Sequence, residues 1–122
     1  MFQEYNPNPL HKQVGDCAVR AISKALDISW DKAFAIMTIK AFIIADLPSA
    51  NSVWGSVLKD HGFSKEIIID ECTAEEFCNA NSKGIFVLGF GNHVATAIDG
   101  TIYDSWNSTQ EIPQYYWYKK GE

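Results

Sequence analysis

Cys17 is the residue in this chain best suited to nucleophilic chemistry, because it stands at the expected start of a helix. It follows Gly15 and Asp16 and opens the run CAVRAISKAL, in which apolar residues recur at helical spacing. Asp16 is a favoured N-cap residue, so the pattern predicts a helix that begins at Cys17. The unpaired N–H groups and the positive dipole end of a first turn stabilise a thiolate over a thiol. The backbone N–H of Cys17 is also a candidate donor to an oxyanion.

His93 and Asp104 are expected to lie together on a β-hairpin. The segments HVATAI and TIYDSW alternate like strands and are joined by Asp99-Gly100, a favourable two-residue turn. If these two residues form the loop, His93 is opposite Trp106, and His93 and Asp104 are diagonal neighbours on one face. The carboxylate then orients the imidazole through one ring nitrogen and leaves the other nitrogen free to act on Cys17.

This arrangement resembles the papain-like cysteine peptidases. The shared features are the helix-opening Cys17, the distant His93, and the run Asp104-Ser105-Trp106, which is similar to the Asn-Ser-Trp run of papain. The Gly-Asp-Cys start is also similar to the compact peptidase domains of bacteriocin exporters. The resemblance implies a Cys17-His93-Asp104 triad in a compact member of bacterial or phage type, with Trp106 shielding the His93–Asp104 hydrogen bond from water.

The papain-like family also uses a glutamine before the cysteine as an oxyanion donor. Gln13 is the nearest candidate, although it is two residues closer to the cysteine than in the family, and His11 occupies the family's spacing. The Cys-Gly-x-Cys-Trp signature of papain itself is absent. Trp30, Trp54 and the run Tyr115-Tyr116-Trp117 are interpreted as core. Of these, Trp54, which precedes Gly55 after a proline-containing loop, is also a candidate pocket wall.

The sequence predicts an α+β fold, with N-terminal helices packed on a C-terminal antiparallel sheet in a papain-like arrangement. After the first helix, Ser29 is expected to cap a second helix that extends to about Ala41, with Phe34 on its apolar side. The remaining elements are expected as follows: a third helix from about residue 51 to 61, a strand at 65–70, a capping box at 73–76, and strands at 85–90, 93–98, 101–106 and 115–118.

Composition indicates one globular domain over residues 1–122, and the resemblance to the papain-like peptidases implies a protein or peptide substrate. Hydrophobic residues make up 47% and charged residues 20% of the 122 residues. The net charge of −5 argues against nucleic acid as the main partner, and no apolar stretch is long enough to span a membrane. The oligomeric state is not predicted by these patterns.

The three cysteines are interpreted as reduced thiols of a cytoplasmic protein, because no secretion signal is visible. Cys72, Cys78 and His61 lack the close spacing of zinc ligands, so neither a metal nor another cofactor is expected. His11 and His61 are interpreted as surface or capping residues.

The leading hypothesis is therefore a thiol hydrolase that cleaves a peptide or isopeptide bond by acyl transfer. Two alternatives remain. The same triad serves transglutaminases, deamidases and acyltransferases, which differ in the acyl acceptor. The second alternative is a papain-like module that has no catalytic activity and only binds a partner protein.

Overall fold

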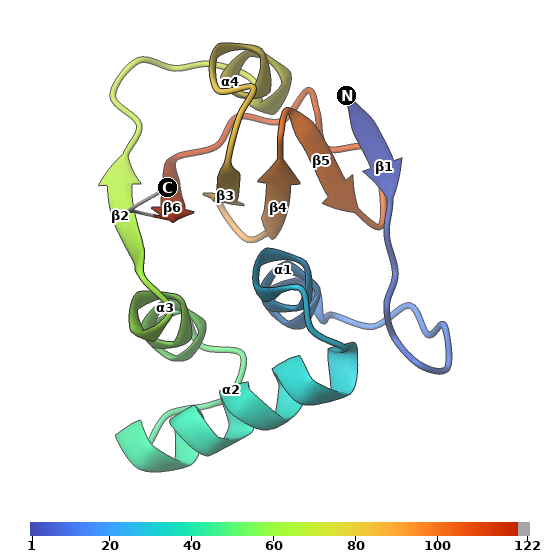
Figure 1. The fold of residues 1–122 in the computed structure, drawn as a ribbon, viewed down its shortest axis with the longest axis vertical. Coiled ribbons are helices and arrows are strands. Elements are labelled where there is room, and N and C mark those ends of the chain that lie inside the picture. The colour runs from blue at the N-terminus through green and yellow to red at the C-terminus, as the bar shows by residue number, and fades with distance from the viewer. Residues whose placement is uncertain (120–122) are drawn as a thin grey trace.

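The computed structural model describes residues 1–119 and has the α+β architecture that the sequence predicts. Three helices come early in the chain, and most of the sheet comes late (Figure 1). The helices are α1 (Cys17–Leu26), α2 (Trp30–Ile44), α3 (Asn51–Asp60) and α4 (Ala74–Ala80). The strands are β1 (Phe2–Glu4), β2 (Phe63–Ile67), β3 (Ile85–Gly89), β4 (Val94–Ile98), β5 (Thr101–Asp104) and β6 (Tyr115–Lys119).

The sheet is mixed, so the expectation of an antiparallel sheet is wrong at one edge. The described strands form one six-stranded sheet in the order β1-β5-β4-β3-β6-β2. β1 pairs with β5 in parallel, and the other neighbouring strands are antiparallel. β1 has only three residues, too few to show an alternating pattern, and it forms because its backbone continues the hydrogen-bonding edge of β5.

The hairpin between β4 and β5 has the predicted register. Thr101 is paired with Ile98, and Tyr103 with Thr96. Asp99 and Gly100 both have positive φ angles, of 49° and 84°, as a type I′ turn requires. Because a two-residue loop of this type permits only one pairing, the local sequence determines which side chains share a face.

The other boundaries differ modestly from the expected ones. The strand expected at 65–70 begins and ends earlier, because buried Phe63 anchors it beside α3. The strand expected to begin at His93 begins at Val94, and the strand expected to continue to residue 106 ends at Asp104. His93 and Trp106 therefore lie just beyond the paired strands. The capping box at Thr73 and Glu76 is confirmed.

Helices cover both faces of the sheet (Figure 1). One core cluster joins α1, α2 and α3 to side chains such as Val87 and Val94. A smaller cluster joins α4 to the opposite face, where Leu88 and Ala95 lie. α1 packs on β4, and the Thr96 hydroxyl donates a hydrogen bond to the Ala21 carbonyl oxygen at 2.7 Å. This contact holds the helix that carries Cys17 against the strand that follows His93.

α2 lies farthest from the sheet and is apolar on more than one side. Ala33, Met37 and Ala41 are buried, whereas Phe34, expected on the apolar side, is 45% exposed. The Phe34 ring stacks on Trp30 instead, because Ala33 and Met37 already occupy the positions that face α1 and α3. The helix also extends three residues beyond the expected end, to Ile44.

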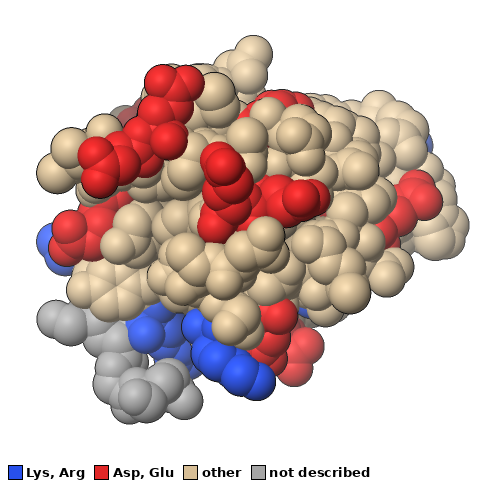
Figure 2. Space-filling view, turned by 90° about the horizontal axis from the view of Figure 1, so that it is seen from above, with Lys and Arg blue, Asp and Glu red and all other residues tan. Residues whose placement is uncertain are grey.

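Asp and Glu side chains are spread over the face seen from the α4 side, and Lys and Arg side chains lie mainly along one edge of that view (Figure 2). Two of the acidic residues, Glu75 and Glu76, lie in the first turn of α4, where a negative charge is favourable to the helix dipole.

Candidate active site

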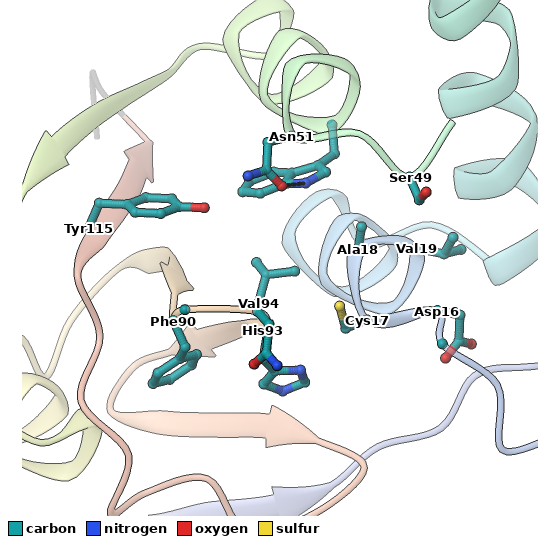
Figure 3. A pocket seen from close by; sticks show the side chains of 14 residues that line it. Asp16, Cys17, Ala18, Val19, Ser49, Asn51, Phe90, His93, Val94 and Tyr115 are labelled. Carbon is teal, nitrogen blue, oxygen red and sulfur yellow. Dashed lines mark hydrogen bonds between the residues drawn. The ribbon is translucent and has the colours of Figure 1, made fainter. Parts of the chain in front are cut away.

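Cys17 lies at the first residue of α1 and is partly exposed. Its backbone N–H has no acceptor within the helix because of this position. In Figure 3 the Cys17 sulfur lies between the start of α1 and the His93 ring, at the wall of a cavity. The prediction that the cysteine opens a helix is confirmed.

His93 and Asp104 form the pair that the hairpin register predicts. His93 Nε2 lies 2.7 Å from Asp104 Oδ2, and both side chains are buried. The same carboxylate oxygen accepts a hydrogen bond from the Ser108 hydroxyl at 2.7 Å, and Oδ1 accepts one from the Ser105 backbone N–H. Since Nε2 is engaged by the carboxylate, Nδ1 is the ring nitrogen left to act on Cys17.

Two aromatic rings pack against the His93 imidazole. The Trp106 ring centroid lies 4.1 Å from that of His93, with 30° between the planes. The Phe90 ring is stacked at 5.8 Å. Trp106 is 46% exposed, and its indole N–H donates to Glu111 Oε2. Trp106 thus contacts His93 as expected and separates the imidazole from part of the solvent.

The environment of Cys17 favours the thiolate. Burial on its own raises the pKa of this thiol, but hydrogen bonding to His93 and to the backbone of Val94, together with the charges of His93 and Arg20, outweighs it. The net effect is a Cys17 pKa below the ordinary value for cysteine. A thiolate with this environment is an activated nucleophile.

The His93 imidazole is correspondingly basic. Burial lowers its pKa, but hydrogen bonds and charge interactions with Asp104 and Cys17 outweigh burial and raise the pKa from 6.5 to about 9. The two partners therefore favour a thiolate–imidazolium pair around neutral pH.

A buried ion network connects the start of α1 to the triad, and sequence reasoning missed its central member, Arg20. The guanidinium of Arg20 bonds the Asp16 carboxylate, and its second nitrogen lies 3.6 Å from Asp104 Oδ1. Asp16 occupies the predicted N-cap position, but its side chain makes no capping hydrogen bond. Its carboxylate turns inward to Arg20 and to the Trp30 indole N–H, 2.8 Å away. The four-residue spacing of Asp16 and Arg20 was the available signal.

Ser108 is a second residue that sequence reasoning missed. It is fully buried and donates to Asp104, but it lies in a loop beyond β5. No periodic pattern marks such a position, so only the tertiary structure identifies it.

Two depressions meet at Cys17 and His93. One has a volume of about 300 Å³, and Trp54 and Tyr115 form part of its wall. The other, of about 450 Å³, is bounded in part by Gln13 and Trp106. The structure thus brings the predicted oxyanion and pocket residues to depressions that Cys17 borders, Trp54 to the first and Gln13 and Trp106 to the second.

Ring stacking and a hydrogen bond hold the wall of the smaller depression. The Trp54 ring stacks on Tyr115 with 6.5 Å between ring centroids, and its indole N–H donates to Asn51 Oδ1 at 3.0 Å. Tyr115 in turn lies over Gly89, where an added Cβ would stand only 2.1 Å from the tyrosine Cζ. Glycine at this position therefore lets the ring lie directly on the strand. Tyr115 and Asn51 were not identified from the sequence.

The remaining histidines lie apart from the triad. His11 is exposed in the loop that precedes α1. His61 follows the last residue of α3, where its Nδ1 lies 2.9 Å from the Val57 carbonyl oxygen. The interpretation of these two residues as surface or capping side chains is confirmed.

In comparisons with known proteins, no family model, no curated protein and no solved structure matched this chain. Over residues 1–119, none of the helices has the length and apolar character needed to cross a membrane.

Proposed function

We propose that this protein is a cysteine-nucleophile hydrolase of papain-like type that cleaves a peptide or isopeptide bond. The observation that carries the proposal is the grouping of a thiol of lowered pKa, a basic imidazole and a buried carboxylate beside an open depression. Nucleophile, base and orienting group are the three parts that acyl transfer by a cysteine needs.

In the proposed reaction, the Cys17 thiolate forms a bond to the carbonyl carbon, and the carbonyl electron pair moves onto oxygen. The tetrahedral intermediate collapses, the carbon–nitrogen bond breaks, and the leaving amine takes the proton from Nδ1 of His93. Water then loses a proton to His93 and attacks the thioester. Breakage of the carbon–sulfur bond releases the carboxylic acid and restores the thiolate and the imidazolium.

Asp104 keeps Nε2 of His93 hydrogen bonded throughout this cycle. Its second role is electrostatic, because the negative carboxylate stabilises the imidazolium that exists in the resting enzyme and after water attack.

The backbone N–H of Cys17 is the first donor that we assign to the oxyanion, because it is free at the start of α1. Gln13 is the second, because it borders a depression together with Cys17 and His93. A side-chain amide from the loop before the helix then takes the part that the family's glutamine plays, despite its different spacing.

A polypeptide substrate fits this surface better than a small molecule does. The two depressions meet at Cys17 and His93, and most of the residues that line them are uncharged. Aromatic rings contribute to both: Trp54, Phe90 and Tyr115 to one and Trp106 to the other. An extended chain lying across Cys17 would fill both. The net charge of −5 makes nucleic acid an unfavourable partner. A reducing compartment such as the cytoplasm suits the free Cys17 thiol.

Alkylation with iodoacetamide at pH 6–7, followed by mass spectrometry of each cysteine peptide, tests the activated thiolate. We expect Cys17 to react at least about tenfold faster than Cys72, whose pKa is raised by burial and by Glu76 and Asp70. Equal rates at the two residues would remove the basis of the proposal.

Product analysis with a peptide library tests the reaction itself. We expect cleaved peptides from the unmodified protein and none from the Cys17→Ala variant. A primary amine added to the same reaction reports on the acyl acceptor. Predominant transamidation would replace the hydrolase by an acyltransferase with the same triad, and binding of peptides without any product would identify a binding module.

A further inference from the structure

Arg20 is a buried cation placed between two carboxylates. Only 6% of its surface is exposed, although arginine is normally an exposed residue. Its guanidinium bonds Asp16 with one nitrogen, and the other terminal nitrogen lies 3.6 Å from Asp104 Oδ1. One planar side chain therefore links the residue before the nucleophile to the residue that orients the imidazole.

The Asp16 end of this link is firmly held. The second oxygen of the Asp16 carboxylate accepts a hydrogen bond from the Trp30 indole N–H. The Asp16 backbone carbonyl accepts the Arg20 N–H at 2.9 Å, so both ends of the pair belong to the first turn of α1. Asp16 itself is 6% exposed. This network limits the rotamers available to Arg20 and so fixes the direction of its second terminal nitrogen, toward Asp104.

At the other end of the link, both oxygens of the Asp104 carboxylate are held by polar contacts. Oδ2 accepts from His93 Nε2 and from the Ser108 hydroxyl. Oδ1 accepts the Ser105 N–H and faces Arg20. A carboxylate held on both oxygens cannot rotate away from the imidazole without breaking several contacts.

We infer that Arg20 is a positioning residue for the proposed reaction, because it holds the Asp104 carboxylate toward His93 and ties the hairpin to the start of α1. This inference rests on the proposed function for its purpose, although its test needs no substrate. The carboxylates that contact Arg20 are Asp16 and Asp104, and its positive charge also favours the Cys17 thiolate. The other titratable groups that act on Cys17 are His93 and Tyr115.

The test is the pH dependence of Cys17 alkylation in the full chain, with Cys72 as the internal reference. We expect Arg20→Met to raise the midpoint of this curve by about one pH unit, which is a tenfold loss of thiolate at pH values below the midpoint. A residue that merely packs would change the melting temperature and leave the midpoint of the folded protein where it was. An unchanged midpoint overturns the inference.

Arg20→Lys separates positioning from simple charge. Lysine keeps one positive charge but has a single ammonium group, which cannot bridge Asp16 and Asp104 as the planar fork does. We expect Arg20→Lys to raise the pH midpoint of Cys17 alkylation by about half a pH unit, compared with the unmodified protein. Full recovery of the original midpoint would mean that the charge alone matters and would overturn the positioning role.

A double-mutant cycle shows whether Arg20 acts through Asp104. In an Asp104→Asn background, Arg20→Met is expected to shift the pH midpoint of Cys17 alkylation by less than half of the shift that it causes in the unmodified protein, because the carboxylate that Arg20 positions is no longer present. An undiminished shift contradicts the inference. If Arg20→Met does not fold, the same cycle with Arg20→Lys decides the question.

These outcomes are distinct from failure of the proposed function. Equal reactivity of Cys17 and Cys72 in the unmodified protein contradicts the hydrolase, whereas differences among the Arg20 variants test the positioning role. A chain with a reactive Cys17 and no cleaved product would leave the measured role of Arg20 in thiol activation intact.

Discussion

Cys17 and Cys78 are both partly or fully buried residues of helices, yet their surroundings favour opposite protonation states. Burial raises the pKa of each thiol. Around Cys17, the imidazole of His93, the Val94 backbone and the charge of Arg20 reverse this effect. Cys78 packs in the apolar cluster between α4 and the sheet, and its pKa stays raised. Burial alone thus produces an inert thiol, and reactivity requires hydrogen-bond partners and cations beside the sulfur. Here His93 and Val94 come from outside the helix, and Arg20 comes from α1 itself.

The largest difference between these two cysteines is expected in activity. We predict that Cys17→Ala lowers hydrolysis at least about 1,000-fold, because it removes the nucleophile. Cys78→Ala is the matched control, since it removes the same atom from the opposite face of the sheet. Cys78→Ala should retain activity, and its free energy of unfolding should fall by about 1 kcal/mol because the substitution leaves a small cavity. Peptide cleavage assays and thermal melts of both variants provide the measurement.

Removal of the imidazole should make Cys17 resemble the other cysteines. His93→Ala deletes the largest of the contributions that lower the Cys17 pKa, so we expect its alkylation rate at pH 7 to fall about tenfold or more. His61→Ala is the control, because His61 lies at the end of α3. If Cys17 in His93→Ala still reacts at its original rate, the imidazole is not what distinguishes it from Cys78.

The titration of His93 reports the other half of the pair. We expect an NMR midpoint of about 9, compared with 6.5 for an ordinary histidine, and a lower midpoint in Cys17→Ala, because Cys17 is one of the groups that raise it. A raised pKa means that the stabilisation from His93 is complete below pH 6.5 and disappears as the pH rises through about 9.

The Cys17→Ala variant isolates this contribution to stability, since the opposing titration of Cys17 is absent. Its melting temperature should therefore decline as the pH rises from 6.5. A midpoint near 6.5 in the unmodified protein, or a stability that increases over this range in the variant, would contradict the ion pair.

The smallest effect is expected at Ser108. Ser108→Ala removes one of the donors to Asp104 Oδ2. We expect the free energy of unfolding to fall by about 1–2 kcal/mol and the titration midpoint of His93 to shift by a few tenths of a pH unit. Thr96→Val is the control, because it removes another buried hydroxyl whose partner is the Ala21 carbonyl. Equal His93 midpoints in the two variants would show that Ser108 acts on stability alone.

The His93–Asp104 pair could be predicted because its geometry is local. Asp99-Gly100 permits one hairpin register, and this register places His93 and Asp104 on one face. The start of α1 follows from the apolar pattern after Cys17. The side chain of Asp16 was misread because a carboxylate before a helix usually caps it, whereas here the buried guanidinium of Arg20 is a stronger partner.

The elements that were missed depend on contacts between distant segments. β1 has too few residues for a pattern, and it is ordered by pairing with β5 about one hundred residues later. The wall formed by Trp54 and Tyr115 joins α3 to β6, and only their packing over Gly89 reveals it.

By itself, the sequence determined the α+β class, the helix that Cys17 opens and the register that pairs His93 with Asp104, because these depend on periodicity, capping and one tight turn. Only the tertiary structure decided that Cys17 lies beside His93, that Arg20 lies between two carboxylates and that two depressions meet at the thiol. The contacts of Cys17 with His93 and of Arg20 with Asp104 join residues far apart in the chain, and their geometry follows from how α1 packs against the sheet, which no local pattern specifies.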